Sequence, residues 1–348
     1  MNNQLYTATD LGFSAHFLSQ LDLDELERCA PVRVVEVQRD RLTVLGEEGQ
    51  LLLSLPASMS SGEFAVGDWV LVDEAKLFHR RLQPKSSLSR RAAGSDASVQ
   101  LIANNVDTLF IVSSCNSDFS VARLERYLAL ASGSAVTPVV LLTKADLDEN
   151  APELQQQAES LMAFLTVLAI DATDPAVVGL LQPWCGAGQT IALVGSSGVG
   201  KTTLLNALTG ENATTQGVRA DDDKGRHTTT ARAMRPIKTG GWVIDTPGMR
   251  ALRLQDAAEG IDAVFDEISR RANDCRFTNC QHESEPGCAV QAAISSGELD
   301  AERLLRWRKL QREDIHNSQT LAEARQRDKQ FGKMVNRVVS EKKRRKGS

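Results

Sequence analysis

The sequence predicts a multidomain protein with a small N-terminal β-barrel, a central α/β domain on a mostly parallel sheet, and a mainly helical C-terminal domain. Three observations predict it. Short apolar strands separated by glycines fill residues 31–75, strands and helices alternate from about residue 98, and three cysteines and a histidine crowd into residues 275–288. The expected divisions are an N-terminal extension at 1–30 and domains at 31–83, 98–258 and 259–348.

The composition is that of an ordinary globular protein. Of the 348 residues, 42% are hydrophobic and 24% are charged. No stretch approaches the ~18 consecutive apolar residues of a membrane span, and the first Lys or Arg is Arg28, so a signal peptide is not expected. Cys29, Cys115 and Cys185 are scattered singly, as reduced thiols usually are. We therefore expect a cytoplasmic protein without membrane contact.

The net charge of −5 is unevenly distributed along the chain. From Arg325 to Lys346, ten basic side chains stand against two acidic ones, and residues 76–91 carry six Lys or Arg and no acid. Such segments are either solvated and flexible or form surfaces that contact phosphates. Two of them on an acidic protein favour phosphate contact.

Residues 31–75 predict the barrel. The runs VRVVEVQ, RLTVLG, QLLLSLP and DWVLVDE alternate or run apolar, and Gly46, Gly49, Gly62 and Gly67 separate them. An OB-fold is a small barrel of this kind that binds oligonucleotides, and a β-sandwich without a ligand is the alternative. The basic stretch 76–91 would then be the linker to the next domain.

The alternation that begins near residue 98 predicts a parallel sheet with helices on both faces. The expected strands are 107–114, 137–143, 166–171 and 190–195, the helices are 121–133, 151–165, 202–210 and 302–313, and a hairpin spans 231–246 with its turn at Gly240-Gly241.

The stretch GSSGVGKT matches the phosphate-loop pattern G-x-x-x-x-G-K-[ST], and an apolar run precedes it as the motif requires. Main-chain N–H groups of such a loop donate to phosphates. Lys201 would reach the β- and γ-phosphates, and Thr202 would place its hydroxyl on Mg²⁺. The residues expected to bind the nucleotide here are Gly195, Ser196, Ser197, Gly198, Val199, Gly200, Lys201, Thr202 and Thr203.

The stretch DTPG, at the end of the apolar run WVI, fits a sensor of the γ-phosphate. Asp245 suits a Mg²⁺ contact through water, and the Gly248 N–H suits a γ-phosphate oxygen. Between this stretch and the phosphate loop, Thr228, Thr229 and Thr230 are available to complete the Mg²⁺ shell.

The stretch LLTKADL ends a strand in Thr143-Lys144-Ala145-Asp146 and fits a guanine reader. The Asp146 carboxylate can accept from N1–H and N2–H₂ of guanine, a pair of donors that adenine does not offer on that edge. The aliphatic part of Lys144 can lie over the ring. Thr143 stands where such motifs more often carry Asn, and the loop that usually follows with Ser-Ala is here DATD, Asp171–Asp174.

The order of these motifs is unusual. The base reader comes first, then the phosphate loop, then the sensor, whereas an ordinary GTPase begins with the phosphate loop. Joining the ends of such a domain and cutting it after the sensor gives this order with the sheet intact, which is plausible because domain termini often lie close together. The sequence therefore predicts a circularly permuted P-loop GTPase.

Downstream of the sensor, CRFTNCQHESEPGC supplies three thiolates and one imidazole on one tight loop. Cys275, Cys280, His282 and Cys288 suit a closed, tetrahedral, structural zinc site with one Zn²⁺ per chain. Reduced thiols beside an uninvolved histidine are the alternative. A catalytic zinc is not expected, since four ligands leave no open position.

Together the permuted motifs, the preceding barrel, GRHTTT, DTPG and the Cys-His loop resemble the small-subunit-dependent ribosome biogenesis GTPases, the RsgA or YjeQ family, over roughly residues 31–320. The resemblance implies an N-terminal OB-fold, a permuted GTPase and a C-terminal zinc domain. It also implies binding to the small ribosomal subunit and its rRNA late in maturation, with hydrolysis stimulated by that subunit. We expect a monomer that binds GTP and GDP, with Mg²⁺ accompanying GTP.

The residues that could catalyse hydrolysis come from several separate stretches of the sequence. Met249 follows the sensor glycine, where many GTPases carry a water-orienting Gln, and Met cannot orient water. The resemblance offers His227 as a substitute, although a His in a polar loop can also be a bystander; Lys201 and Thr229 complete the candidate catalytic group. The leading hypothesis is a slow GTPase whose hydrolysis releases it from an assembling subunit. The alternatives are an RNA-binding assembly module with negligible turnover and an ATPase, which Asp146 disfavours.

Overall fold

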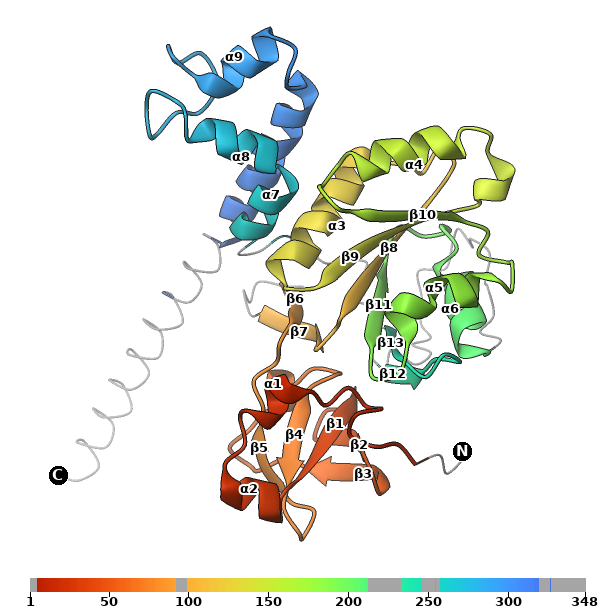
Figure 1. The fold of residues 1–348 in the computed structure, drawn as a ribbon. Coiled ribbons are helices and arrows are strands. Elements are labelled where there is room, and N and C mark those ends of the chain that lie inside the picture. The colour runs from red at the N-terminus through yellow and green to blue at the C-terminus, as the bar shows by residue number, and fades with distance from the viewer. Residues whose placement is uncertain are drawn as a thin grey trace, which may run out of the picture.

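The computed structural model describes residues 5–91, 99–211, 233–245, 254, 257–318 and 326 (Figure 1). Several predicted functional positions lie outside these described residues: His227, Thr228–Thr230, Gly248, Met249 and almost all of the basic tail.

The predicted N-terminal strands are confirmed. They are β1 (Ala30–Val37), β2 (Arg41–Gly46), β3 (Gly49–Ser54) and β4 (Trp69–Val72), followed by β5 (Phe78–Arg81). All pair antiparallel, in the order β3-β2-β1-β4-β5, around a core of eight buried apolar side chains. The arrangement fits a small barrel, and its assignment as an OB-fold remains a prediction. Two short helices, α1 (Ala15–Leu18) and α2 (Leu23–Arg28), precede it, and a 3-10 turn at Ser61–Glu63 leads into β4.

The prediction of a linker at residues 76–91 is wrong. Beyond β5, the stretch contains β6 (Ser87–Arg91), which pairs with β7 (Val99–Asn104). Its cations also have partners inside the protein: Arg80 lies 2.5 Å from Glu25, and Lys76 lies 2.9 Å from Glu48. Arg81 and Lys85 pair with Asp68 and Asp107. Four of the six cations of this stretch are thus paired with acids from other parts of the chain, which reduces the local excess of positive charge.

The central domain has the predicted doubly covered sheet. Its strands run in the order β10-β9-β8-β11-β13-β12, with the first five parallel and β12 antiparallel to β13 in the predicted hairpin. All seven residues of β8 are buried, as a central parallel strand requires. The strands are β8 (Thr108–Ser114), β9 (Thr137–Thr143), β10 (Thr166–Ile170), β11 (Thr190–Val194), β12 (Ala233–Pro236) and β13 (Trp242–Asp245).

Alternate residues of strand β8 pack into two separate hydrophobic cores. Leu109 and Ile111 of β8 pack in the same cluster as α3 (Val121–Gly133) and α4 (Ala151–Glu159), while Phe110 and Val112 share the other cluster with α5 (Val177–Cys185) and α6 (Lys201–Thr209). The period of two along the strand thus places one helix pair on each face.

Helix α4 is shorter than expected. The apolar pattern predicts a helix to Leu165, but α4 ends at Glu159. The Ser160 hydroxyl donates to the Gln157 carbonyl over 2.8 Å, and Phe164 takes a left-handed φ of +59°, which a continuing right-handed helix cannot contain. Leu165 is buried after this turn, where the chain enters β10.

The barrel and the central sheet form one continuous structure. Strand β1 pairs with β12 at Glu36 and Ala233. The buried Arg33 guanidinium donates to the carbonyls of Leu11 and Asn105, which belong to the N-terminal segment and to the entry of the central domain. The Trp242 Nε1–H donates to the Asp10 carbonyl over 2.8 Å, so the N-terminal segment is packed against both domains.

The C-terminal part is mainly helical, as predicted. It contains α7 (Ala258–Val264), α8 (Asp266–Ala272), α9 (Ala289–Ser295) and a further helix at 301–318. Helix α7 lies directly against α3 (Figure 1): a Cβ at Gly260 would come within 2.0 Å of the Ala129 carbonyl oxygen. No helix within the described residues has the length and apolar character needed to cross a bilayer.

Candidate nucleotide site and metal cluster

The phosphate-loop motif forms the turn between β11 and α6. Three glycines hold it in conformations that other residues avoid, with φ of +144° at Gly195, +80° at Gly198 and +93° at Gly200. A Cβ on Gly195 would also lie 2.1 Å from the Val112 carbonyl oxygen, so the loop can pass β8 only with glycine there.

The Lys201 ammonium is hydrogen-bonded to the backbone of this loop. Its Nζ donates to the Gly195 carbonyl over 2.9 Å and to the Ser196 carbonyl. Ser197, Gly198 and Thr202 are exposed at the loop and the first turn of α6. Backbone N–H groups at a helix N-terminus beside a lysine ammonium attract an anion.

The base-reading motif lies beside the phosphate loop although the two are far apart in the sequence. The buried Thr143 hydroxyl contacts the Val199 carbonyl at 2.6 Å and the Ser113 carbonyl at 3.1 Å. Lys144, with a left-handed φ of +58°, donates from Nζ to the Gly198 carbonyl over 3.1 Å. The structure therefore brings the two motifs together at the carboxyl ends of β9 and β11.

Asp146 lies in the turn that follows β9. It belongs to a 3-10 turn at Ala145–Leu147, and its side chain is exposed. The carboxylate is therefore open to solvent in the turn that follows Lys144.

The DATD loop is the neighbour of this turn. Strand β10 pairs in parallel with β9 so that Ile170 faces Thr143. Asp171 accepts hydrogen bonds from the Thr173 hydroxyl at 2.6 Å and the Thr173 N–H at 2.7 Å, which hold the pKa of its carboxyl below its usual value. Asp174 accepts from the Ala176 N–H at 2.8 Å. The loop is thus a well-bonded turn at the edge of the candidate base site.

Asp245 ends β13, the strand next to β11, and its side chain is exposed there. It therefore lies at the same edge of the sheet as the phosphate loop. Gly248, His227 and Thr229 lie outside the described residues, and their roles stay predictions.

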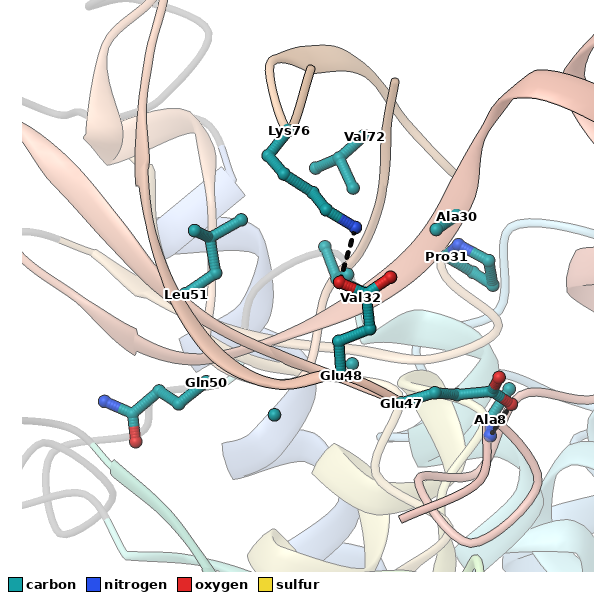
Figure 2. Close-up of a pocket in the computed structure, with 12 residues that line it drawn as sticks. Ala8, Ala30, Pro31, Val32, Glu47, Glu48, Gln50, Leu51, Val72 and Lys76 are labelled. Atoms are coloured by element: carbon teal, nitrogen blue, oxygen red, sulfur yellow. Dashed lines mark hydrogen bonds and ion pairs between the residues drawn. The ribbon is translucent and has the colours of Figure 1, made fainter. Parts of the chain in front are cut away.

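A pocket of about 290 Å³ on the barrel is separate from these loops (Figure 2). Val32, Leu51 and Val72 line it, and the ion pair between Lys76 and Glu48 crosses it. None of the described nucleotide-site residues lines it, so it is not the phosphate-loop site.

The predicted metal ligands are gathered into one cluster. The ligand atoms of Cys275, Cys280, His282 and Cys288 all lie within 4.8 Å of one another. The Cys275 and Cys288 sulfurs are 3.9 Å apart, and each is 3.5 Å from His282 Nδ1. A tetrahedral zinc, with bonds of about 2.3 Å to sulfur and 2.0 Å to nitrogen, would give roughly 3.8 and 3.5 Å. The cluster therefore has the dimensions of a metal-binding site.

Comparison with known proteins agrees with this architecture. The fold is similar to that of YjeQ from Thermotoga maritima (TM-score 0.60, 23% identity, covering 81% of this chain and 97% of that one). It is also similar to YloQ, described as a circularly permuted GTPase (TM-score 0.57, 22% identity, 86% and 96% covered).

The sequence comparisons decide the family. The profile of the RsgA GTPase family matches residues 81–255. A Vibrio vulnificus protein named small ribosomal subunit biogenesis GTPase RsgA 2 is 49% identical, over 98% of this chain and 97% of its own length. The chain belongs to the RsgA GTPase family. A Mesorhizobium japonicum relative named small ribosomal subunit biogenesis GTPase RsgA is 52% identical over 89% of this chain and 90% of its own.

The predicted fold is therefore that of an RsgA-family GTPase, including the circular permutation. Strand β8 comes early in the chain and lies between β9 and β11, parallel to both. Strand β11, which leads into the phosphate loop, is therefore inside the sheet although its motif comes late in the sequence.

The pKa values of the Cys-His cluster bear on its ability to bind a metal. Burial, together with the Arg308 guanidinium, holds the pKa of His282 below its usual value, so the imidazole is neutral at pH 7 and can offer a lone pair. Burial raises the pKa of the Cys275 thiol, but hydrogen bonds with the Ala289 and Val290 N–H groups and with the Cys288 and Cys280 side chains together leave it below its usual value. These two lowered pKa values favour the forms that bind metal, whereas burial raises the pKa of the Cys280 thiol to about 11, so a bound cation would have to displace that proton.

Sequence reasoning missed the residues that support this cluster. The Gln291 side chain and Arg308 both donate to the His282 carbonyl, and the Trp307 ring lies 5.6 Å from the imidazole. His282 itself has a left-handed φ of +58°. The only available signal was the basic, aromatic character of the helix at 302–313, which does not specify a partner.

Proposed function

We propose that the protein is a GTP hydrolase that binds the small ribosomal subunit and acts late in its maturation. The observation that carries this proposal is the contact of the base-reading turn with the phosphate loop, through Thr143 and Val199 at 2.6 Å. A guanine reader and a phosphate cradle that meet at one edge of a sheet form a guanine-nucleotide site. The names of the curated relatives support the subunit as partner.

In this proposal, Asp146 pairs with guanine N1–H and N2–H₂, and Lys144 covers the ring, with Thr143 and Ala145 completing the turn. The exposed position of Asp146 beside the loop supports this role. The phosphates are bound by the main chain of Gly195–Thr203 and by Lys201.

Two oxygen donors are available for Mg²⁺. The Thr202 hydroxyl lies on the first turn of α6, and the Asp245 carboxylate ends the adjacent strand; both are exposed at the loop. Hydroxyl and carboxylate oxygens suit this hard cation. When bound, the ion would neutralise charge on the β- and γ-phosphates.

For hydrolysis we propose Lys201, His227 and Thr229. Lys201 stabilises charge on the phosphates, Thr229 completes the shell around Mg²⁺, and His227 takes the place of the missing water-orienting Gln. Because Met249 cannot orient water, turnover in isolation should be slow. Docking on the subunit would raise this turnover.

The Cys-His cluster is proposed to hold one structural Zn²⁺ per chain. Three thiolates and a neutral imidazole, with the separations measured above, match its preferred ligands. All four positions would be filled by protein, so the ion would stabilise the C-terminal domain and take no part in hydrolysis.

The working state would be a cytoplasmic monomer without membrane contact. GTP would favour the form that binds the subunit and its rRNA, and hydrolysis would release it. Linkage then requires the subunit to change the preference between GTP and GDP by the same factor.

The test is turnover of GTP by the purified protein with and without small subunits. We expect slow turnover alone and a large rise with the subunit, which His227→Ala reduces. A non-hydrolysable GTP analogue should also give tighter subunit binding than GDP. Equal subunit affinity in both nucleotide states, without stimulation, would favour the RNA-binding module instead.

A further inference from the structure

A pocket of about 320 Å³ lies between the Cys-His cluster and the helix at residues 301–318. Trp307, Gln311 and Ile315 line it from the helix, at a spacing of four residues that places them on one side. Residues 280–283 of the cluster loop form the facing wall. None of the described residues proposed to bind the nucleotide lines this pocket, so it is a separate site.

The Trp307 indole gives this pocket a hydrogen-bond donor that the protein does not use. The side chain is only 6% exposed, and its Nε1–H has no acceptor among the described residues. Buried donors in proteins are nearly always paired, because an unpaired one loses its hydration without gaining a partner. Since Trp307 lines the pocket, an acceptor atom of a ligand could supply this partner.

Two guanidinium groups add positive charge to the same pocket. Arg308 donates to the carbonyls of Gln281 and His282, and its buried Nε–H has no acceptor in the part of the chain that the structure describes. Arg312 also lines the pocket and is exposed. Neither arginine forms an ion pair with a described carboxylate, whereas Arg303 on the same helix pairs with two. The charge of these two arginines is therefore available to a ligand.

The lining fits a ligand with one negative charge and an apolar part. Two arginines and Glu283 give the lining a net charge of +1. Ile315, which is 53% exposed, adds an apolar surface at the rim. An RNA strand brings a phosphate with every nucleotide and would meet the Glu283 carboxylate. A single carboxylate on a protein chain matches the charge, and the planar guanidinium group suits its two oxygens.

We propose that this pocket binds a carboxylate of an acidic protein segment. Arg312 pairs with the carboxylate, the Trp307 Nε1–H donates to one of its oxygens, and Ile315 contacts the aliphatic part of the ligand. The pocket would thus be a protein-binding site beside the Cys-His cluster, and this role does not depend on hydrolysis of GTP.

The test is a titration of the full-length, metal-replete protein with the peptide acetyl-Gly-Glu-Leu-amide, which carries one carboxylate. The matched peptide acetyl-Gly-Gln-Leu-amide has nearly the same shape without the charge. Heteronuclear NMR of the indole N–H groups follows binding. The chain has four tryptophans, and Trp307→Phe identifies the Trp307 signal by its loss. We expect the Glu peptide to shift this signal with a Kd of about 1 mM or tighter, and the Gln peptide to leave it unmoved.

Three variants separate the pocket from the overall charge of the helix. Arg312→Gln should weaken the Glu peptide about tenfold, as for loss of one hydrogen bond to a charged group. Arg312→Lys keeps the charge without the planar fork and should lose less. Lys309→Gln removes an exposed cation that does not line the pocket and should bind as wild type does. Because Arg312 is exposed, its variants should keep the fold, which zinc content and circular dichroism check.

Three results would overturn the inference. Equal binding of the Glu and Gln peptides would show that the charge is not read. Equal losses in Arg312→Gln and Lys309→Gln would reduce the effect to general attraction by the helix. A single-stranded RNA oligonucleotide that shifts the Trp307 signal and displaces the Glu peptide would assign the pocket to phosphate instead. A shift with the Glu peptide alone, lost in Arg312→Gln, would support it.

Discussion

The Cys-His cluster and the proposed nucleotide site are built in opposite ways. All four cluster residues fall between Cys275 and Cys288, and their ligand atoms lie within 4.8 Å of one another. The nucleotide site instead joins a turn at Lys144 to a loop at Gly198, fifty-four positions apart in the sequence, over a 3.1 Å contact. The cluster depends on local chain geometry and on the proposed metal, whereas the proposed nucleotide site depends on the whole sheet. Damage to one should therefore leave much of the other intact.

The largest effect should come from removing the metal. Because binding of a structural metal contributes directly to folding free energy, chelation or Cys280→Ser should destabilise the region after about residue 260 while GDP binding persists. Metal analysis, circular dichroism and Trp307 fluorescence measure this. Cys29→Ser, which changes a cysteine outside the cluster, should keep the metal and the fold. Purified wild-type protein without zinc would contradict the assignment.

Lys201→Ala should have the next largest effect. It should damage the proposed nucleotide site and spare the Cys-His cluster. Loss of the ammonium at the phosphate loop should reduce kcat/KM for GTP by about a hundredfold or more, as for other lost electrostatic stabilisers. Zinc content and the melting of the C-terminal domain should not change. Ser197→Ala is the control, since its exposed side chain leaves the loop's main-chain donors intact. Unchanged turnover in Lys201→Ala would move the active site elsewhere.

Asp146→Asn should weaken GTP by about a hundredfold, since it exchanges a carboxylate acceptor of two guanine donors for an amide. The affinity for xanthine nucleotides, whose altered ring edge suits the amide, should rise. Competition assays with GTP, XTP and ATP measure both effects, with Asp148→Asn as the neighbouring control. If ATP competes equally in the wild type, Asp146 is not the base reader.

Thr143→Val should have the smallest effect. It removes only the hydroxyl between the base-reading turn and the Val199 carbonyl, so GTP and GDP should both weaken about fivefold without a change in base preference. Calorimetric titration with GDP checks this. Thr143→Ser, which keeps the hydroxyl, should bind nearly as wild type does. A shift in base preference in Thr143→Val would show instead that this residue reads the base directly.

Much of the fold could be predicted because it depends on short-range patterns. Residues 121–133 and 137–143 form the expected helix and strand at the expected bounds, since periodicity and end signals act within a few residues. The phosphate loop and the Cys-His cluster are recognisable for the same reason: their ligands and glycines are fixed by spacing along the chain.

The sequence by itself determined the chemistry of each motif, the class of the fold and the permuted order. Only the tertiary structure decided which distant groups meet: Glu25 with Arg80 in the predicted linker, Glu125 with Arg303, and Asp314 with Ala257. It also placed β1 beside β12 and so joined the barrel to the central sheet. Local propensity is set by neighbours in the chain, but a charge is neutralised, or a backbone group satisfied, by whichever partner folding brings within about 3 Å.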